Sequence, residues 1–97
     1  MKRDEVIRTL QAHGTELAKQ HRVKSLAVFG SLARDDAAET SDVDLIVEFD
    51  RPIGLLAFAR LRRYLSELLG TEVDLVTPNA LREEMREQVL REAIRAA

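Results

Sequence analysis

The sequence predicts an α/β fold: a small mixed sheet of at least three strands with helices packed on it. Three short apolar runs, at residues 23–29, 43–49 and 72–76, have the length and composition of buried strands. Segments with helical spacing of apolar residues stand before, between and after these runs. The link between the first two strands holds only a short helix, so parallel and antiparallel pairing both remain open.

The first two helices flank the first strand. One is predicted from Asp4 to about Gln20, where apolar residues recur on one side at helical spacing. A shorter helix is predicted from Ser31, as its N-cap, to about Asp36, and a loop over residues 37–41.

The last two helices flank the third strand. A long helix with an apolar stripe is predicted to end near Leu69, where Gly70 provides a C-terminal stop. After the strand, Thr77 is predicted to cap a final helix that has Pro78 at its first position and continues towards Arg95.

Length and composition narrow the classes of protein. A chain of 97 residues has apolar material for one core, which predicts a single domain over residues 1–97. It has no cysteine, no apolar run long enough to span a membrane and no signal sequence, so we expect a soluble cytoplasmic protein without disulfides. A net charge of -2 gives no support for nucleic-acid binding.

The stretch from Gly30 to Phe49 carries the candidate chemistry. Gly30 and Ser31 stand between an apolar strand and a helix, where free backbone amides and a hydroxyl suit phosphate oxygens. A plain turn with a capping serine has the same sequence, so this pair alone is weak evidence.

Three aspartates are the stronger signal. Asp42 and Asp44 point to one face of a predicted strand, and Asp74 joins them if its strand lies alongside. Two like charges about 4 Å apart cost roughly 4 kcal/mol at a typical protein surface, and a cation removes that cost. Oxygen ligands without His or Cys suit Mg²⁺ or Mn²⁺. Taken singly, each aspartate is better explained without a metal: Asp42 as a loop cap, Asp44 as a solvated strand end and Asp74 as an exposed edge residue.

The combined pattern resembles a known family. Gly30-Ser31, a spacer ending at Ser41, then Asp42-Val43-Asp44-Leu45 and a later Asp74 are similar to the motif of the DNA polymerase β-type nucleotidyltransferases. More narrowly, the chain resembles the minimal nucleotidyltransferase (MNT) antitoxins of MNT/HEPN toxin-antitoxin pairs. The resemblance covers nearly the whole chain and implies the polymerase β-like fold.

The resemblance also implies an activity and the residues that perform it. It implies that Asp42, Asp44 and Asp74 hold the metal ions, and that Gly30 and Ser31 hold the outer phosphates of ATP. AMP would pass from ATP to a tyrosine hydroxyl of a HEPN-family toxin, with Asp74 accepting the proton.

Several alternatives remain open at this stage. Arg34 either contacts the triphosphate or is a solvated helix residue, and Ser41 either orients Asp42 or closes a turn. The chain could also neutralise its partner by occlusion alone, or transfer a nucleotide to a small molecule. Neutralisation by occlusion predicts that a variant without the carboxylates of Asp42 and Asp44 still neutralises its partner. Transfer to a small molecule predicts turnover without any protein acceptor.

Overall fold

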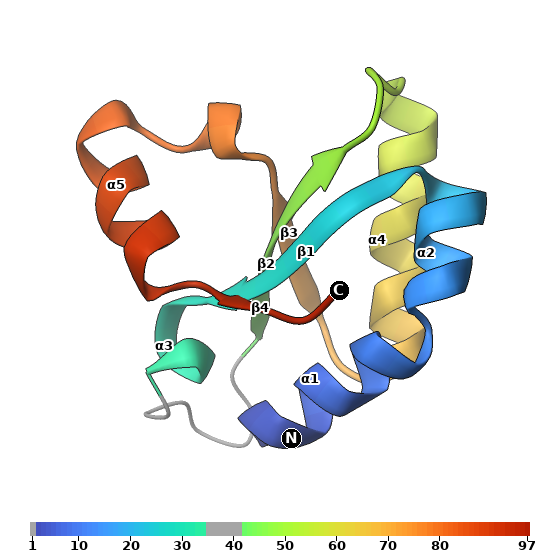
Figure 1. The fold of residues 1–97 in the computed structure, drawn as a ribbon, viewed down its shortest axis with the longest axis horizontal. Helices are drawn as coiled ribbons and strands as arrows, with labels where there is room; N and C mark the ends of the chain where they lie inside the picture. The colour runs from blue at the N-terminus through green and yellow to red at the C-terminus, as the bar shows by residue number, and fades with distance from the viewer. Residues whose placement is uncertain (1, 35–41) are drawn as a thin grey trace.

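The structure, a computed structural model, describes residues 2–34 and 42–97 and contains a four-stranded mixed sheet (Figure 1). Strand β1 is antiparallel to both β2 and β4, whereas β2 is parallel to β3. The order across the sheet is β3-β2-β1-β4. The strands are β1 (Val23–Phe29), β2 (Val43–Phe49), β3 (Val73–Val76) and β4 (Ile94–Arg95). The predicted α/β class is confirmed, and the pairing of the first two strands is antiparallel.

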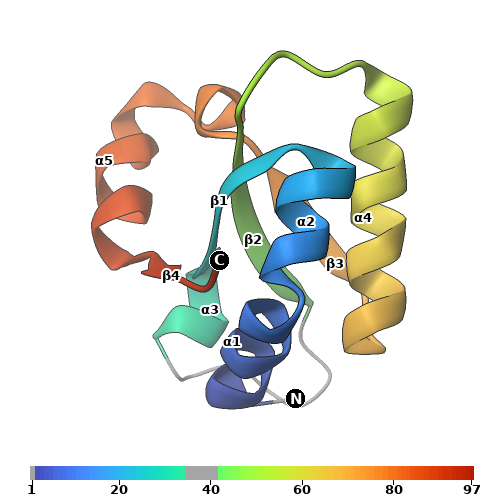
Figure 2. The same cartoon turned by 45° about the vertical axis from the view of Figure 1, so that its right-hand side comes forward.

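Helices cover both faces of the sheet, but unequally. Helices α1, α2 and α4 lie together on one face of the sheet and α5 lies on the other face, as Figures 1 and 2 both show. A single-turn helix follows β1 and a short 3-10 helix follows β3. The helices are α1 (Arg3–Ala12), α2 (Gly14–His21), α3 (Gly30–Ala33), α4 (Leu55–Leu69), η1 (Pro78–Ala80) and α5 (Glu83–Glu92).

The hydrophobic core lies between the sheet and the helices α1, α2 and α4 that cover one of its faces. Alternate residues of β2, namely Val43, Leu45 and Val47, are buried in this core. Fully buried leucines of the helices meet them, among them Leu10, Leu17, Leu61 and Leu65. Since strand side chains alternate between faces, the core fixes which side chains of β2 point away from it. Those are Asp44, Ile46 and Glu48.

The single helix predicted from Asp4 to Gln20 is wrong, because the structure divides it into α1 and α2. The break lies at His13, whose backbone leaves the helical region with φ -108° and ψ 15°. Gly14 then begins α2. Each of the two short helices buries its own apolar residues: Val6 and Leu10 in α1, and Leu17 in α2.

Replacing Gly14 by alanine should stabilise the protein by about 0.5 to 1 kcal/mol. An added Cβ at this position would meet no atom within 4 Å, and alanine reduces the conformational freedom of the unfolded chain. Urea denaturation measures the effect. Gly54→Ala is the matched control: its site is equally open, but Gly54 is the N-cap of α4, where alanine is a poor residue. Equal gains from both variants would contradict this explanation.

The prediction of one final helix from Pro78 towards Arg95 is also wrong in its extent. The chain forms η1, passes through extended backbone at Leu81 and Arg82, and only then forms α5. Thr77 precedes η1 without a side-chain capping hydrogen bond. The guanidinium of Arg86 donates to the carbonyl oxygens of Pro78 and Leu81, at 2.9 and 3.2 Å, and so supports this break.

The C-terminal residues form a strand that the sequence did not predict. Ile94 and Arg95 pair with β1 opposite Val28 and Ala27. The pairing continues as backbone bonds that join Leu26 to the last two residues, and Ala96 is buried. A helix end frays easily, and here the long-range strand pairing outweighs one further helical turn.

The α4 region matches the prediction closely. The helix ends at Leu69, and Gly70 follows in the left-handed region with φ 69°, as expected of a glycine stop. Among the described residues, no helix is long and apolar enough to cross a membrane.

Candidate active site

The turn from β1 into α3 lies directly against β2. Phe29, the last residue of β1, pairs with Asp44, and Gly30 follows with a positive φ of 70°. A Cβ built on Gly30 would collide with Oδ2 of Asp44. The position therefore requires glycine for two reasons: its backbone conformation and the close approach of the aspartate.

Ser31 lies at the predicted place but not in the predicted role. Helix α3 begins at Gly30, its N-cap is Phe29, and no side chain caps it, so the assignment of Ser31 as N-cap is wrong. Ser31 is half-buried in the first turn. The end of α3 is fixed by Arg3 of α1, which donates from Nη1 to the carbonyl of Ala33 at 3.0 Å.

The parallel pairing of β2 and β3 brings two of the predicted aspartates side by side. Asp44 and Asp74 are register partners, and Asp42 directly precedes Val43, the first residue of β2. Neighbouring strands lie about 4.8 Å apart, and register partners point to the same face. Asp44 is half-buried, whereas Asp42 and Asp74 are exposed. The sheet thus gathers the three carboxylates at one end of β2 and β3, away from the main core.

The charges of this cluster act on one another. Burial raises the pKa of Asp44, and the neighbouring carboxylates of Asp74 and then Asp42 raise it further. The positive charge of Arg34 acts in the opposite direction on the same pKa. Asp44 is therefore a carboxylate whose ionised form is costly in the protein alone.

The closeness of these carboxylates does not by itself make a metal site. Among the residues that the structure describes, no three His, Cys, Asp or Glu side chains are grouped so that they could hold a metal ion. The backbone register nevertheless brings Asp44 and Asp74 together, and the charges of both Asp74 and Asp42 act on Asp44.

Arg34 lies at the end of α3 and connects it to α5. Its Nη1 donates to Oε2 of Glu92 at 3.5 Å, and Nε2 of Gln88 donates to the other oxygen of Glu92 at 3.4 Å. This arrangement holds a guanidinium next to the carboxylate cluster. Sequence reasoning singled out Arg34 but missed Glu92, which lies 58 positions further along the chain and has no local signal.

Ser41, predicted to contact nucleotide or to orient Asp42, lies outside the described residues. The structure therefore locates six of the seven candidate positions. Five of them stand where β1 ends and β2 and β3 begin: Gly30, Ser31, Asp42, Asp44 and Asp74. Arg34 follows at the end of α3.

The structure thus places a turn that requires glycine beside two register-paired aspartates on a mixed sheet, which is the arrangement expected from the resemblance to nucleotidyltransferases. The family model described as a nucleotidyltransferase domain matches residues 10–96, which shows that the chain belongs to this family.

Two relatives match nearly the full length. The protein adenylyltransferase MntA of Thermococcus cleftensis is 42% identical over 91 residues, covering 94% of this chain and 92% of the relative. A solved minimal nucleotidyltransferase is 44% identical with a TM-score of 0.80, covering 97% of this chain and 95% of that one. The predicted resemblance to minimal nucleotidyltransferases is thereby confirmed.

A solved complex of a tri-AMPylated HEPN toxin from Shewanella oneidensis with its MNT antitoxin also matches. Its identity is 18% and its TM-score 0.65, and the match covers 94% of this chain and 71% of that one. At this identity the likeness shows the shared fold alone.

Proposed function

We propose that this chain is the antitoxin of a toxin-antitoxin pair and transfers AMP from ATP to a tyrosine hydroxyl of a HEPN-family toxin. The observation that carries the proposal is the parallel register that sets Asp44 beside Asp74, next to the turn at Gly30 and Ser31. The 42% identical relative named as a protein adenylyltransferase supports AMP as the transferred group. The fold shared with the MNT antitoxin of the AMPylated-toxin complex supports the class of partner.

Each residue has a place in the proposed reaction. Backbone amides at Gly30 and Ser31 bind the β- and γ-phosphates, and the guanidinium of Arg34 neutralises part of their charge. The acceptor oxygen attacks the α-phosphorus, the bond to the β-phosphate oxygen breaks, and pyrophosphate leaves. The exposed carboxylate of Asp74 accepts the hydroxyl proton. The products are an AMP ester on the acceptor and free pyrophosphate.

The three carboxylates also fit a divalent cation in their chemistry. They supply only oxygen donors. Burial, and then the neighbouring carboxylates of Asp74 and Asp42, raise the pKa of Asp44, so a bound cation would stabilise its ionised form. Asp42, Asp44 and Asp74 would hold Mg²⁺ or Mn²⁺, which when bound would lower the pKa of the acceptor hydroxyl and offset phosphate charge.

Mass spectrometry of the toxin tests the proposal. The purified chain, ATP, Mg²⁺ and a HEPN-type toxin encoded beside its gene should yield toxin carrying the added mass of AMP. Chelation of the metal or the Asp42→Ala substitution should abolish the addition. An unmodified toxin in the complete mixture would contradict the proposal. Full neutralisation by an Asp42→Ala, Asp44→Ala double variant would show that occlusion, not transfer, silences the toxin.

A further inference from the structure

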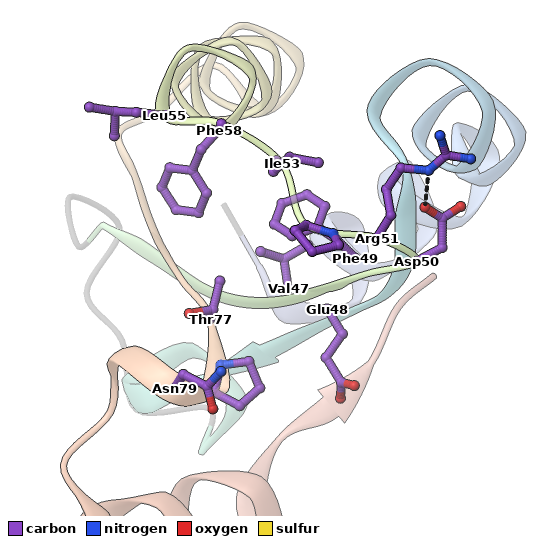
Figure 3. Close-up of a pocket in the computed structure, with 13 residues that line it drawn as sticks. Val47, Glu48, Phe49, Asp50, Arg51, Ile53, Leu55, Phe58, Thr77 and Asn79 are labelled. Carbon is purple, nitrogen blue, oxygen red and sulfur yellow. Dashed lines mark ion pairs between the residues drawn. The ribbon is translucent and has the colours of Figure 1, made fainter.

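The face of the sheet that carries Asp44 also carries a cavity. Side chains of a strand alternate between faces, so Ile46 and Glu48 lie on the same face of β2 as Asp44. Figure 3 shows the side chain of Glu48 on the opposite side of β2 from those of Phe49 and Phe58. A cavity of about 290 Å³ lies on the Glu48 side, between the sheet and α5. Its lining includes Ser25 and Ala27 of β1, Ile46 and Glu48 of β2, Leu90 of α5 and Arg95 of β4.

The cavity begins next to the carboxylate cluster. Ile46, which lines it, is two residues beyond Asp44, a rise of about 7 Å along β2. The neighbouring strand runs beside it in register: Phe29 pairs with Asp44, and Ala27 pairs with Ile46. Register partners point to the same face of a sheet. The carboxylate of Asp44 and the floor of the cavity therefore lie side by side on one surface.

The cavity lies on the same side of Asp44 as the turn from β1 into α3. In the strand order β3-β2-β1-β4, Asp74 stands on β3, at one side of Asp44. Gly30 and Ser31 follow β1, at the other side. The strand residues that line the cavity come from β1, β2 and β4, and among the described residues none comes from β3. One nucleotide can therefore extend from the turn, past Asp44, into the cavity, and leave the Asp74 side open to the acceptor hydroxyl.

The lining of the cavity changes from apolar to polar with distance from Asp44. Ala27 and Ile46 form an apolar floor near the carboxylates. Beyond them stand Ser25 and Glu48, which are register partners, and the Cβ atoms of such partners are about 5 Å apart. This end of the cavity thus offers a hydroxyl donor beside a carboxylate acceptor.

A flat ring with an amino group next to a ring nitrogen matches this lining. Adenine has that edge: its 6-amino group donates hydrogen bonds, and the adjacent N1 accepts one. With the ring on the apolar floor, the amino group would reach the carboxylate of Glu48 and N1 would reach the hydroxyl of Ser25. Glu48 is four residues from Asp44, about 13 Å along the strand, a span that an adenosine and a glutamate side chain fill together.

From these observations we infer that the cavity under α5 binds the adenine of ATP and that Glu48 recognises its amino group. The inference deepens the proposed function and rests on it, because it takes ATP as the substrate. Ala27 and Ile46 support the ring, and Ser25 donates to N1. Glu48 is thus a specificity-determining residue, which selects the base but takes no part in the transfer of the phosphoryl group.

The test compares three ligands of the full chain by isothermal titration calorimetry, with Mg²⁺ present and no toxin. They are ATP, purine riboside triphosphate and inorganic tripolyphosphate. Purine riboside triphosphate has the ring of adenine without its amino group, and tripolyphosphate has no base. We expect the wild type to bind ATP about tenfold more tightly than purine riboside triphosphate, because a hydrogen bond to a charged group is lost.

Substitutions of Glu48 assign this preference to one side chain. Glu48→Ala should weaken ATP binding about tenfold and leave the other two ligands unchanged, so that the preference for the amino group disappears. Glu48→Gln retains an oxygen acceptor and should retain the preference. Glu84→Ala is the matched control, because Glu84 is an exposed carboxylate of α5 that does not line the cavity. It should bind all three ligands as the wild type does.

A second variant fills the cavity and leaves its polar end intact. Ala27→Leu places a larger side chain where the ring would lie. It should weaken ATP and purine riboside triphosphate alike, by several-fold, and leave tripolyphosphate unchanged. Its melting temperature checks that the sheet still forms.

Three results would overturn the inference. The first is equal affinity of the wild type for ATP and purine riboside triphosphate. The second is an unchanged preference for the amino group in Glu48→Ala. The third is a Glu48→Ala variant with wild-type nucleotide affinities but weaker binding of the toxin, because the cavity would then hold the acceptor.

The outcomes also separate the inference from the proposed function. If the toxin gains AMP but the amino group adds no affinity, the transfer activity stands and the base site is wrong. If the three ligands bind as expected but the wild type adds no AMP to the toxin, the base site stands and the transfer activity is wrong. A wild-type chain that binds no ATP would overturn both.

Discussion

Replacing Asp44 by asparagine should reduce AMP transfer by about a thousandfold or more, a loss of about 4 kcal/mol of transition-state stabilisation. In the same variant, the metal-free protein should melt at a higher temperature than the wild type. The two effects have one origin. Asp44 is half-buried beside Asp74 and Asp42, so its ionised form is costly until a cation offsets it. Asparagine has nearly the same shape but neither the charge nor the affinity for metal.

The pH dependence of melting tests the origin of this gain. Burial and neighbouring carboxylates raise the pKa of Asp44, so the folded protein holds its proton to higher pH than the unfolded chain does. The contribution of Asp44 to wild-type stability should therefore fall as pH rises from the unfolded pKa through the raised folded pKa. The gain in the Asp44→Asn variant should appear above that window and vanish below it.

Metal addition and a control variant complete the experiment. Mn²⁺ with ATP should raise the melting temperature of the wild type more than that of Asp44→Asn. Glu84→Gln, which changes an exposed carboxylate of α5, should affect neither transfer nor the response to metal. Wild-type transfer by Asp44→Asn would exclude this carboxylate from the reaction.

The strands that carry the site could be predicted because their signals are local. In β2, the period of two that buries Val43 and Val47 also turns Asp44 to the opposite face, and the structure confirms this. Gly70 likewise identified the end of α4 through its conformation. In both places the residue type, its spacing and the backbone geometry agree.

The features that could not be predicted depend on contacts between distant residues. β4 exists because two residues near the C-terminus pair with β1, and a segment of two residues is too short to show the alternation that predicts a strand. The break at Leu81 is supported by Arg86 from the following helix. Glu92 is recognisable as a partner of Arg34 only once α3 and α5 are adjacent. The resemblance to a family identified the candidate site residues but not these supporting contacts.

Gly30 and Gly70 offer a comparison that isolates what the first glycine does for the site. Both have a left-handed backbone, with φ of 70° and 69°. A Cβ on Gly70 would meet no atom within 4 Å, whereas one on Gly30 would collide with the carboxylate of Asp44. Alanine at either position should cost about 1 to 2 kcal/mol of unfolding free energy for the unfavourable conformation. Only Gly30→Ala adds the collision.

The collision should damage activity more than stability. The atom in the way is the end of an aspartate side chain, which can rotate aside at little cost to folding. Rotation displaces Asp44 from Asp74, and a displacement of about 1 Å can reduce a rate about a hundredfold. We therefore expect similar losses of stability in the two alanine variants by urea denaturation, with AMP transfer reduced about a hundredfold or more only in Gly30→Ala. Equal transfer by the two variants would show that the contact between Gly30 and Asp44 has no part in the chemistry, and that the glycine serves the turn alone.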